Sequence, residues 1–191
     1  MKRQNPSMNP QQVLILQGWH GSGPLHWQMR WVEKYGYQVL TQSDWIRPLR
    51  GDWLARLDDV VSDLKAPVYL VAHSLGCLQV ASWAAISKQT HKVKAALLVA
   101  PSDVEARNFE DVLSSWRPLS LEKLPFNSSM LISQDDPFCT TERAKYFAKA
   151  WGANVYNLGP RGHLNADSNL GDWSEGHAFL NDLMKVNEHG H

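Results

Sequence analysis

Three side chains with the chemistry of a nucleophile, an acid and a base follow one another along this sequence. Ser74 lies in the pentapeptide AHSLG (residues 72–76), an A-x-S-x-G variant of the pattern that places a serine at a sharp turn between a strand and a helix. An acidic pair, Asp135 and Asp136, follows a later apolar run, and His163 follows another. A serine hydroxyl becomes nucleophilic when a histidine takes its proton and a carboxylate holds that histidine in the right tautomer. The order therefore predicts attack on a carbonyl carbon, with one of the two aspartates as the acid.

The turn at Ser74 requires small neighbours. A strained apex residue, with other chain segments packed closely two residues before and after it, leaves little room for side chains at those two positions. Gly76 meets this requirement and Ala72 nearly does. The helix that follows would point its first N–H groups toward developing negative charge, so the amide of Leu75 is a candidate oxyanion donor. The alternative is an ordinary strand–turn–helix crossing in which Ser74 caps the helix.

A glycine-rich loop, GWHGSGP (residues 18–24), follows the apolar run at residues 13–17. Glycines let the backbone approach a ligand and direct N–H groups at it, as a second oxyanion donor after an early strand must do. Trp19 is the candidate for that donor. The alternative is a dinucleotide phosphate site, but these glycines have the spacing G-x-x-G-x-G rather than G-x-G-x-x-G, and proline stands where the helix should begin.

Short apolar runs alternate with helical periodicity through most of the chain. Strands are predicted at residues 13–17, 37–42, 68–72, 95–100, 130–134 and 155–158, and helices at 25–35, from a cap at Asp52 to 64, after Ser74, and at 140–151. This alternation is typical of an α/β protein with a doubly wound, mainly parallel sheet and helices on both faces. Because parallel strands have their carboxyl ends at one edge of the sheet, the serine, the acid and the histidine are expected to meet there.

Length and composition favour one α/β domain over residues 1–191, with loose tails at 1–10 and 186–191. Nineteen basic and nineteen acidic residues balance, and no basic cluster is long enough to follow a phosphate backbone, so no nucleic-acid partner is expected. No apolar run has the length of a membrane span and no signal peptide is apparent. The expected location is therefore cytoplasmic, without a membrane partner.

The cysteines and the other histidines do not have the spacing of a metal site or a disulfide framework. Cys77 and Cys139 match neither a zinc cluster nor a disulfide framework, so both are expected to be inert core residues; a catalytic role for Cys77 would need a lowered thiol pKa. His26 is expected to be a packing or surface residue. The remaining histidines have no metal-ligand spacing, and we assign neither a metal nor a cofactor.

The alternation of strand and helix patterns stops at residues 101–127, whose apolar residues have neither a sustained helical nor a sustained strand periodicity. The segment is too short for a separate cap domain, and two interpretations are open: it lines an acyl pocket, or it is a peripheral helix and loop. Trp19 and Trp116 are the two tryptophans expected near a substrate.

The sequence resembles the small serine hydrolases related to retinoblastoma-binding protein 9, a branch of the α/β-hydrolase superfamily. The resemblance covers nearly the whole chain and rests on the glycine loop with His26-Trp27, on His73-Ser74-x-Gly76, on Asp135-Asp136-Pro137, and on Gly162-His163 with Asn165, Trp173 and Gly176 behind it. It implies a minimal α/β-hydrolase fold with no large cap domain, and a triad whose acid directly precedes the proline, which is Asp136. The chain departs from the family at Ala72, where glycine is usual.

These observations predict a serine hydrolase that cleaves carboxylic esters, with thioesters and amides as related substrates, through an acyl-Ser74 intermediate. Its expected partner is a small-molecule acyl ester, and it is expected to be a monomer or a homodimer. A function of a different class is open: a protein-binding module that keeps the hydrolase fold without physiological catalysis, since fold does not imply function.

Overall fold

The computed structural model describes residues 12–107 and 109–188, and its strands form one sheet. The strands are β1 Val13–Leu16, β2 Gln38–Val39, β3 Val68–His73, β4 Val93–Val99, β5 Asn127–Ile132 and β6 Asn154–Asn157. They lie in the order β2-β1-β3-β4-β5-β6, and every neighbouring pair is parallel. The predicted doubly wound parallel sheet is confirmed.

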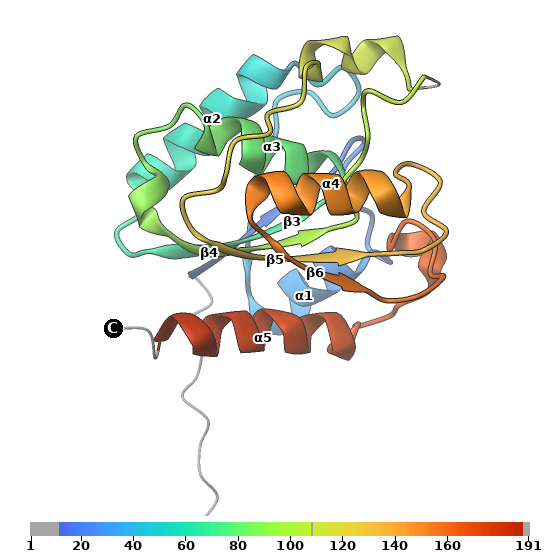
Figure 1. Cartoon of the computed structure of the whole chain (residues 1–191). Coiled ribbons are helices and arrows are strands. Elements are labelled where there is room, and N and C mark those ends of the chain that lie inside the picture. The colour runs from blue at the N-terminus through green and yellow to red at the C-terminus, as the bar shows by residue number, and fades with distance from the viewer. Residues whose placement is uncertain (1–11, 108, 189–191) are drawn as a thin grey trace, which may run out of the picture.

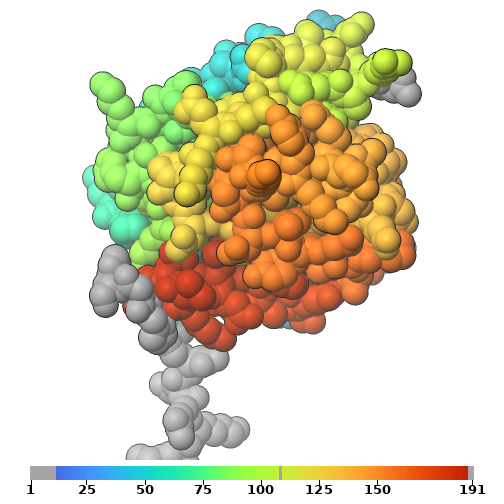
Figure 2. All heavy atoms as spheres, in the orientation of Figure 1, coloured from blue at the N-terminus to red at the C-terminus, as the bar shows by residue number. Residues whose placement is uncertain are grey.

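Helices cover both faces of this sheet (Figure 1). The α-helices are α1 Trp27–Tyr35, α2 Arg50–Asp63, α3 Leu75–Ala84, α4 Thr141–Trp151 and α5 Ser174–Glu188, and short 3-10 helices are η2 Thr90–Lys92, η3 Asp111–Trp116 and η4 Ala166–Ser168. Helices α2, α3 and α4 lie on one face, and α1 and α5 lie on the other (Figure 1). In the space-filling view, the orange atoms of the α4–β6 region cover the middle of the visible face and the red atoms of α5 lie below them (Figure 2).

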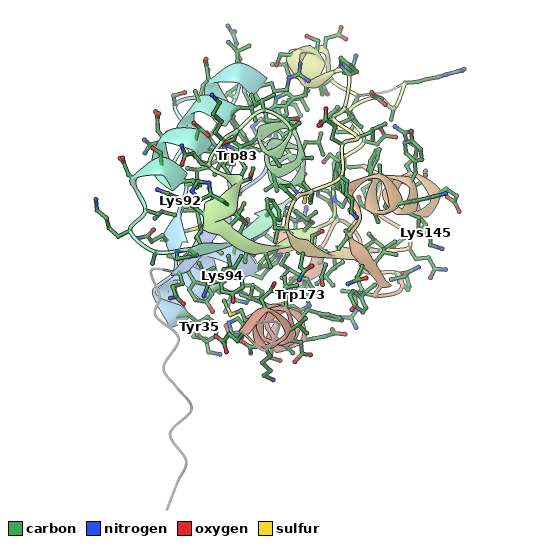
Figure 3. All side chains as sticks on the ribbon, turned by 60° about the vertical axis from the view of Figure 1, so that its left-hand side comes forward. Tyr35, Trp83, Lys92, Lys94, Lys145 and Trp173 are labelled. Atoms are coloured by element: carbon green, nitrogen blue, oxygen red, sulfur yellow. The ribbon has the colours of Figure 1, made fainter. Side chains whose placement is uncertain are left out.

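The two layers of helices bury β3 completely and β4 at all but one position, which explains why these strands are apolar at successive positions rather than at alternate ones. On β3, Leu70 and Ala72 pack in the core beneath α2, α3 and α4, while Tyr69 and Val71 pack in the core beneath α1 and α5. Figure 3 shows Trp83 on the first side of the sheet and Trp173 on the second. Each core is therefore built around large aromatic side chains.

Two predicted elements differ from the structure. The strand predicted at residues 37–42 is only Gln38–Val39, an edge strand whose single neighbour is β1. The predicted cap at Asp52 is wrong, because α2 begins two residues earlier and Asp52 lies within its first turn. The N–H of Arg50 at the start of α2 donates instead to Ser115 Oγ, 3.1 Å away. Because Ser115 is 65 residues from Arg50, the sequence around the start of α2 contains no capping pattern.

Helix α5 has no counterpart among the predicted helices, although its buried residues recur at helical spacing. Residues 186–188, expected in a loose tail, are the last residues of α5. Residues 1–10 and 189–191, the rest of the expected tails, lie outside the described residues. Within the described part of the chain, none of the helices combines the length and the apolar character needed to span a membrane.

Candidate active site

Ser74 occupies the sharp turn between β3 and α3 in a strained backbone conformation. Its φ of 56° and ψ of −121° lie in a region that residues other than glycine rarely adopt. Its own N–H donates to the carbonyl of Val99 at the end of β4, 3.0 Å away, which anchors the turn to the neighbouring strand. The predicted strained apex is therefore present.

At the two glycines that pack against this turn, atoms of another segment come too close for a side chain. A Cβ built on Gly76 would lie 2.6 Å from the carbonyl oxygen of Leu16, at the end of β1. A Cβ on Gly18 would lie 2.9 Å from Ser74 Cβ and 3.3 Å from Ser74 Oγ. The loop after β1 thus packs directly against the serine, as the glycine pattern predicts.

Ser74, His163 and Asp136 form a continuous hydrogen-bonded chain. His163 Nδ1 lies 2.9 Å from each carboxylate oxygen of Asp136, and His163 Nε2 lies 2.9 Å from Ser74 Oγ. An ionised carboxylate can only accept, so the ring proton is on Nδ1 and the Nε2 lone pair faces the serine hydroxyl. The side chains of His163 and Asp136 are 8% and 3% exposed. This arrangement allows the histidine to remove a proton from the serine.

The two adjacent aspartates have different partners. Asp136, which contacts the His163 ring, also accepts from the N–H of Phe138 at 2.9 Å. Asp135 is exposed, and its Oδ1 accepts from the N–H of Gly162 at 2.8 Å and from Ser133 Oγ at 2.9 Å. These bonds, that of Gly162 first, lower the pKa of the Asp135 carboxyl. Asp136 therefore orients the imidazole, while Asp135 fixes the loop that carries it.

Two side chains from other elements hold the backbone of the loop after β6, which carries His163. His73 donates from Nε2 to the carbonyl oxygen of His163 at 2.9 Å, and Trp27 donates from its indole nitrogen to the carbonyl oxygen of Leu164 at 2.8 Å. Leu164 has a positive φ of 50°, so the chain turns sharply just after the histidine. Residue 73, which the serine pattern leaves unspecified, thus fixes the backbone of His163.

His26 and His73 form a neutral histidine pair beside His163. Their ring centroids are 4.7 Å apart, and Nδ1 of His26 caps α1 by accepting from the N–H of Gln28 at 3.1 Å. Burial, followed by the charge of His163, lowers the pKa of His26 to about 4. Burial also lowers the pKa of His73 well below its ordinary value. His26, expected at a packing or surface position, is a buried helix cap.

We expect the free energy of unfolding to fall as the pH is lowered from about 6.5 toward 4. In that window His26 and His177, both with a pKa of about 4 in the folded chain, stay neutral until the chain unfolds and then take up protons. The unfolded state therefore binds more protons, and acid favours it. Urea unfolding at several pH values measures the change, and His177→Gln should reduce the drop.

Carboxylates do not obscure this measurement. Asp44, Asp135 and Asp172 also have lowered pKa values, mainly through hydrogen bonds, but their contribution is lost only below about pH 5, so the histidine effect is measured between about pH 6.5 and 5. A free energy of unfolding that stays constant down to that pH would contradict the assignment of neutral buried histidines.

A cavity of about 380 Å³ opens at Ser74. Its lining includes the apolar side chains of Leu75, Phe109, Leu113 and Phe138, together with residues 18–21 of the loop that contains Trp19. Because Phe109 and Leu113 belong to the segment 101–127, that segment contributes to the lining of the cavity, as its first interpretation requires.

The two candidate oxyanion donors, Trp19 and Leu75, both border this cavity. Within residues 12–107 and 109–188, no carbonyl of a turn or loop accepts from either amide. Both N–H groups therefore lack such an acceptor in the described part of the chain and stay candidates for an oxyanion donor.

The expectation that Trp116 lies near a substrate is wrong. Trp116 is 1% exposed, donates from its indole nitrogen to Pro48 O at 2.8 Å, and packs edge-on against Trp53. The cavity residues that were not expected at this place from the sequence are His26, Ser102 and Phe138. Ser102 could have been predicted as a site residue, since it is a polar residue just after the end of β4, as Asp136 is just after the end of β5.

Neither cysteine has the character of a reactive thiol. Burial raises the pKa of Cys77, and burial with the nearby charges of Asp103 and Asp136 raises that of Cys139 to about 12. Both are buried in the core, as predicted. Among residues 12–107 and 109–188, no three His, Cys, Asp or Glu side chains are grouped closely enough to hold a metal ion.

Comparison with known proteins places this geometry in a family. A family model described as serine hydrolase matches residues 13–182. Among curated protein sequences there is no significant match. A YdeN-like hydrolase from Pectobacterium atrosepticum is 24% identical with a TM-score of 0.81, over 92% of this chain and 91% of that one.

Two further solved structures have the same fold. The ydeN gene product of B. subtilis is 21% identical with a TM-score of 0.70, over 92% of this chain and 99% of its own. Est1E from Butyrivibrio proteoclasticus is 14% identical with a TM-score of 0.70, over 97% and 93%. At these identities the likeness shows the fold alone. The match over residues 13–182 shows more: this chain belongs to the serine hydrolase family.

Proposed function

We propose that this protein hydrolyses carboxylic esters of small acyl groups, with thioesters and amides as related substrates, through a covalent acyl-enzyme on Ser74. The observation that carries the proposal is the hydrogen-bonded chain from Ser74 through His163 to Asp136 at the mouth of a cavity. Each group has the partner that its role requires.

In the first half of the reaction, His163 Nε2 takes the proton of Ser74 as Oγ forms a bond to the substrate carbonyl carbon. The carbonyl π electrons move to the oxygen, where the amides of Trp19 and Leu75 donate to the resulting oxyanion. When these electrons return, the bond to the alcohol oxygen breaks, and His163 gives its proton to the departing alcohol. Asp136 stabilises the imidazolium that exists between the two transfers.

In the second half, His163 takes a proton from water, whose oxygen attacks the acyl carbon. Collapse of this second tetrahedral intermediate breaks the bond between the acyl carbon and Ser74 Oγ, and the bonding electrons return to Oγ with the proton from His163. A carboxylic acid is released and the enzyme is restored. No cofactor enters either half.

The walls of the cavity favour a short or aromatic acyl group. A volume of about 380 Å³ is at the small end of ligand pockets, and the apolar part of its lining includes Phe109 and Phe138. Est1E, whose structure holds ferulic acid, shares only the fold with this chain. An aromatic acid of that kind nevertheless belongs in the first substrate panel.

Labelling with a fluorophosphonate tests the proposal. The expected result is one label per chain, located on Ser74 by peptide mass spectrometry, together with turnover of p-nitrophenyl acetate and butyrate. Ser74→Ala should show neither. A label on a different serine would contradict the assignment of the nucleophile. If neither labelling nor turnover of any ester in the panel occurs, the protein-binding alternative is favoured.

A further inference from the structure

Ser74 Oγ has a second hydrogen-bonding partner that the triad does not include. Ser102 Oγ lies 2.7 Å from Ser74 Oγ, a shorter distance than the 2.9 Å to His163 Nε2. Ser102 is 4% exposed and borders the cavity. A buried hydroxyl in contact with the proposed nucleophile calls for a chemical account.

The direction of this hydrogen bond follows from the rest of the site. His163 carries its proton on Nδ1, facing Asp136, so its Nε2 can only accept from Ser74. The single proton of the Ser74 hydroxyl is thereby engaged. The proton between the two serines must then belong to Ser102, which donates to Ser74 Oγ.

The chain presents Ser102 in a fixed position. Ala100 at the end of β4 has a positive φ of 47°, a strained conformation for alanine, and turns the chain toward the site. The N–H of Asp103 donates to the carbonyl oxygen of Phe138 at 2.9 Å, which ties this loop to the loop that carries Asp136. The Asp103 carboxylate accepts from Arg143 at 2.7 and 3.0 Å. Ser102 thus lies next to a residue fixed by an ion pair, Asp103, and in contact with Ser74.

We propose that Ser102 is a further catalytic residue, whose hydroxyl donates to Ser74 Oγ and stabilises the negative charge on that oxygen in the transition states; the inference rests on the proposed function. Oγ carries this charge while its bond to the acyl carbon forms in acylation and while the same bond breaks in deacylation. A hydrogen bond to a charged oxygen is stronger than one to a neutral hydroxyl, so the stabilisation is greater in the transition state than in the resting enzyme.

The same contact directs the attack. A tetrahedral oxygen has four directions, and on Ser74 Oγ one holds Cβ, one points to His163 and one receives the Ser102 proton. Only the fourth is left for the substrate carbon. Ser102 and His163 therefore select together the lone pair that attacks, and no proton leaves Ser102 at any step.

Three variants test this role with a fluorophosphonate and with the burst kinetics of p-nitrophenyl acetate. Ser102→Ala removes the donor, and Ser102→Thr keeps a hydroxyl at the same position. Ser128→Ala is the control: Ser128 is also buried, its hydroxyl has no partner, and it lies on β5 outside the cavity lining. For Ser102→Ala we expect both the labelling rate and kcat to fall about tenfold, with KM and the melting temperature unchanged.

For Ser102→Thr we expect rates near those of wild type, and Ser128→Ala should match wild type. The role of Ser102 is refuted if wild type is labelled and Ser102→Ala is labelled at the same rate, or if Ser102→Thr is as slow as Ser102→Ala while equally well folded. A Ser102→Ala variant that loses thermal stability but keeps its kcat would show a purely structural role. A wild type that does not react at all would instead refute the proposed function.

Discussion

Asparagine in place of Asp136 is expected to lower kcat for a short-chain ester by about 10⁴-fold, the effect of an acid-to-amide change in another triad enzyme. The amide NH₂ would donate to His163 Nδ1, so the ring proton would move to Nε2. The histidine could then no longer accept the proton of Ser74. Folding should be preserved, because the amide oxygen can still accept from the N–H of Phe138.

Asp135→Asn is the matched control, since it makes the same chemical change one residue away. Asp135 contacts the backbone of Gly162 and not the imidazole, and an asparagine oxygen can accept that bond as well. Its kcat should stay within about tenfold of wild type. If Asp135→Asn loses most of its kcat while Asp136→Asn stays close to wild type, the acid that orients His163 is Asp135.

Alanine in place of Gly76 is expected to destabilise the protein by about 3 kcal/mol or more. The added Cβ would lie 2.6 Å from the carbonyl oxygen of Leu16 and 3.0 Å from that of Gln17. Both are backbone atoms at the end of β1, and they cannot move aside as a flexible side chain could. Either α3 shifts away from the sheet or the turn at Ser74 opens, and urea unfolding measures the loss.

Gly51→Ala is the control for the change of residue type. Gly51 lies in α2, is exposed, and has no atom within 4 Å of the position of an added Cβ. Alanine should stabilise the protein there by up to about 1 kcal/mol, because glycine is a poor helix former. Equal free energies of unfolding for the Gly76→Ala variant and wild type would contradict the close packing at the turn.

The order of strands and helices could be predicted because both faces of the sheet are buried. That burial makes β3 and β4 continuous apolar runs, and the segments between them have helical periodicity. The start of α2 could not be predicted, since Ser115, which accepts from its first N–H, is 65 residues away. The edge strand β2 was overestimated because it pairs with β1 over two residues only.

That Ser74, Asp136 and His163 meet could be predicted because each follows the end of a strand and parallel strands end at one edge. The choice between Asp135 and Asp136 drew on the family resemblance and on Pro137, and the geometry agrees with it. Ser102 and Trp116 show the limit of this reasoning. Which side chain of residues 101–127 faces the cavity depends on the strained bend at Ala100, which a single sequence does not reveal.

The parallel order of the sheet also determines when such a site can exist during folding. Ser74 and His163 are 89 residues apart in the chain, and β3 and β5, which precede Ser74 and Asp136, touch only through β4. Contacts of such large sequence separation form slowly, because a long loop must close before they stabilise anything. An isolated β-α-β unit therefore holds at most the contact between Asp136 and His163, which follow the neighbouring strands β5 and β6, and never the complete proton path to Ser74. The ester turnover that a refolding sample regains would therefore report only the molecules in which β4 has paired with both β3 and β5.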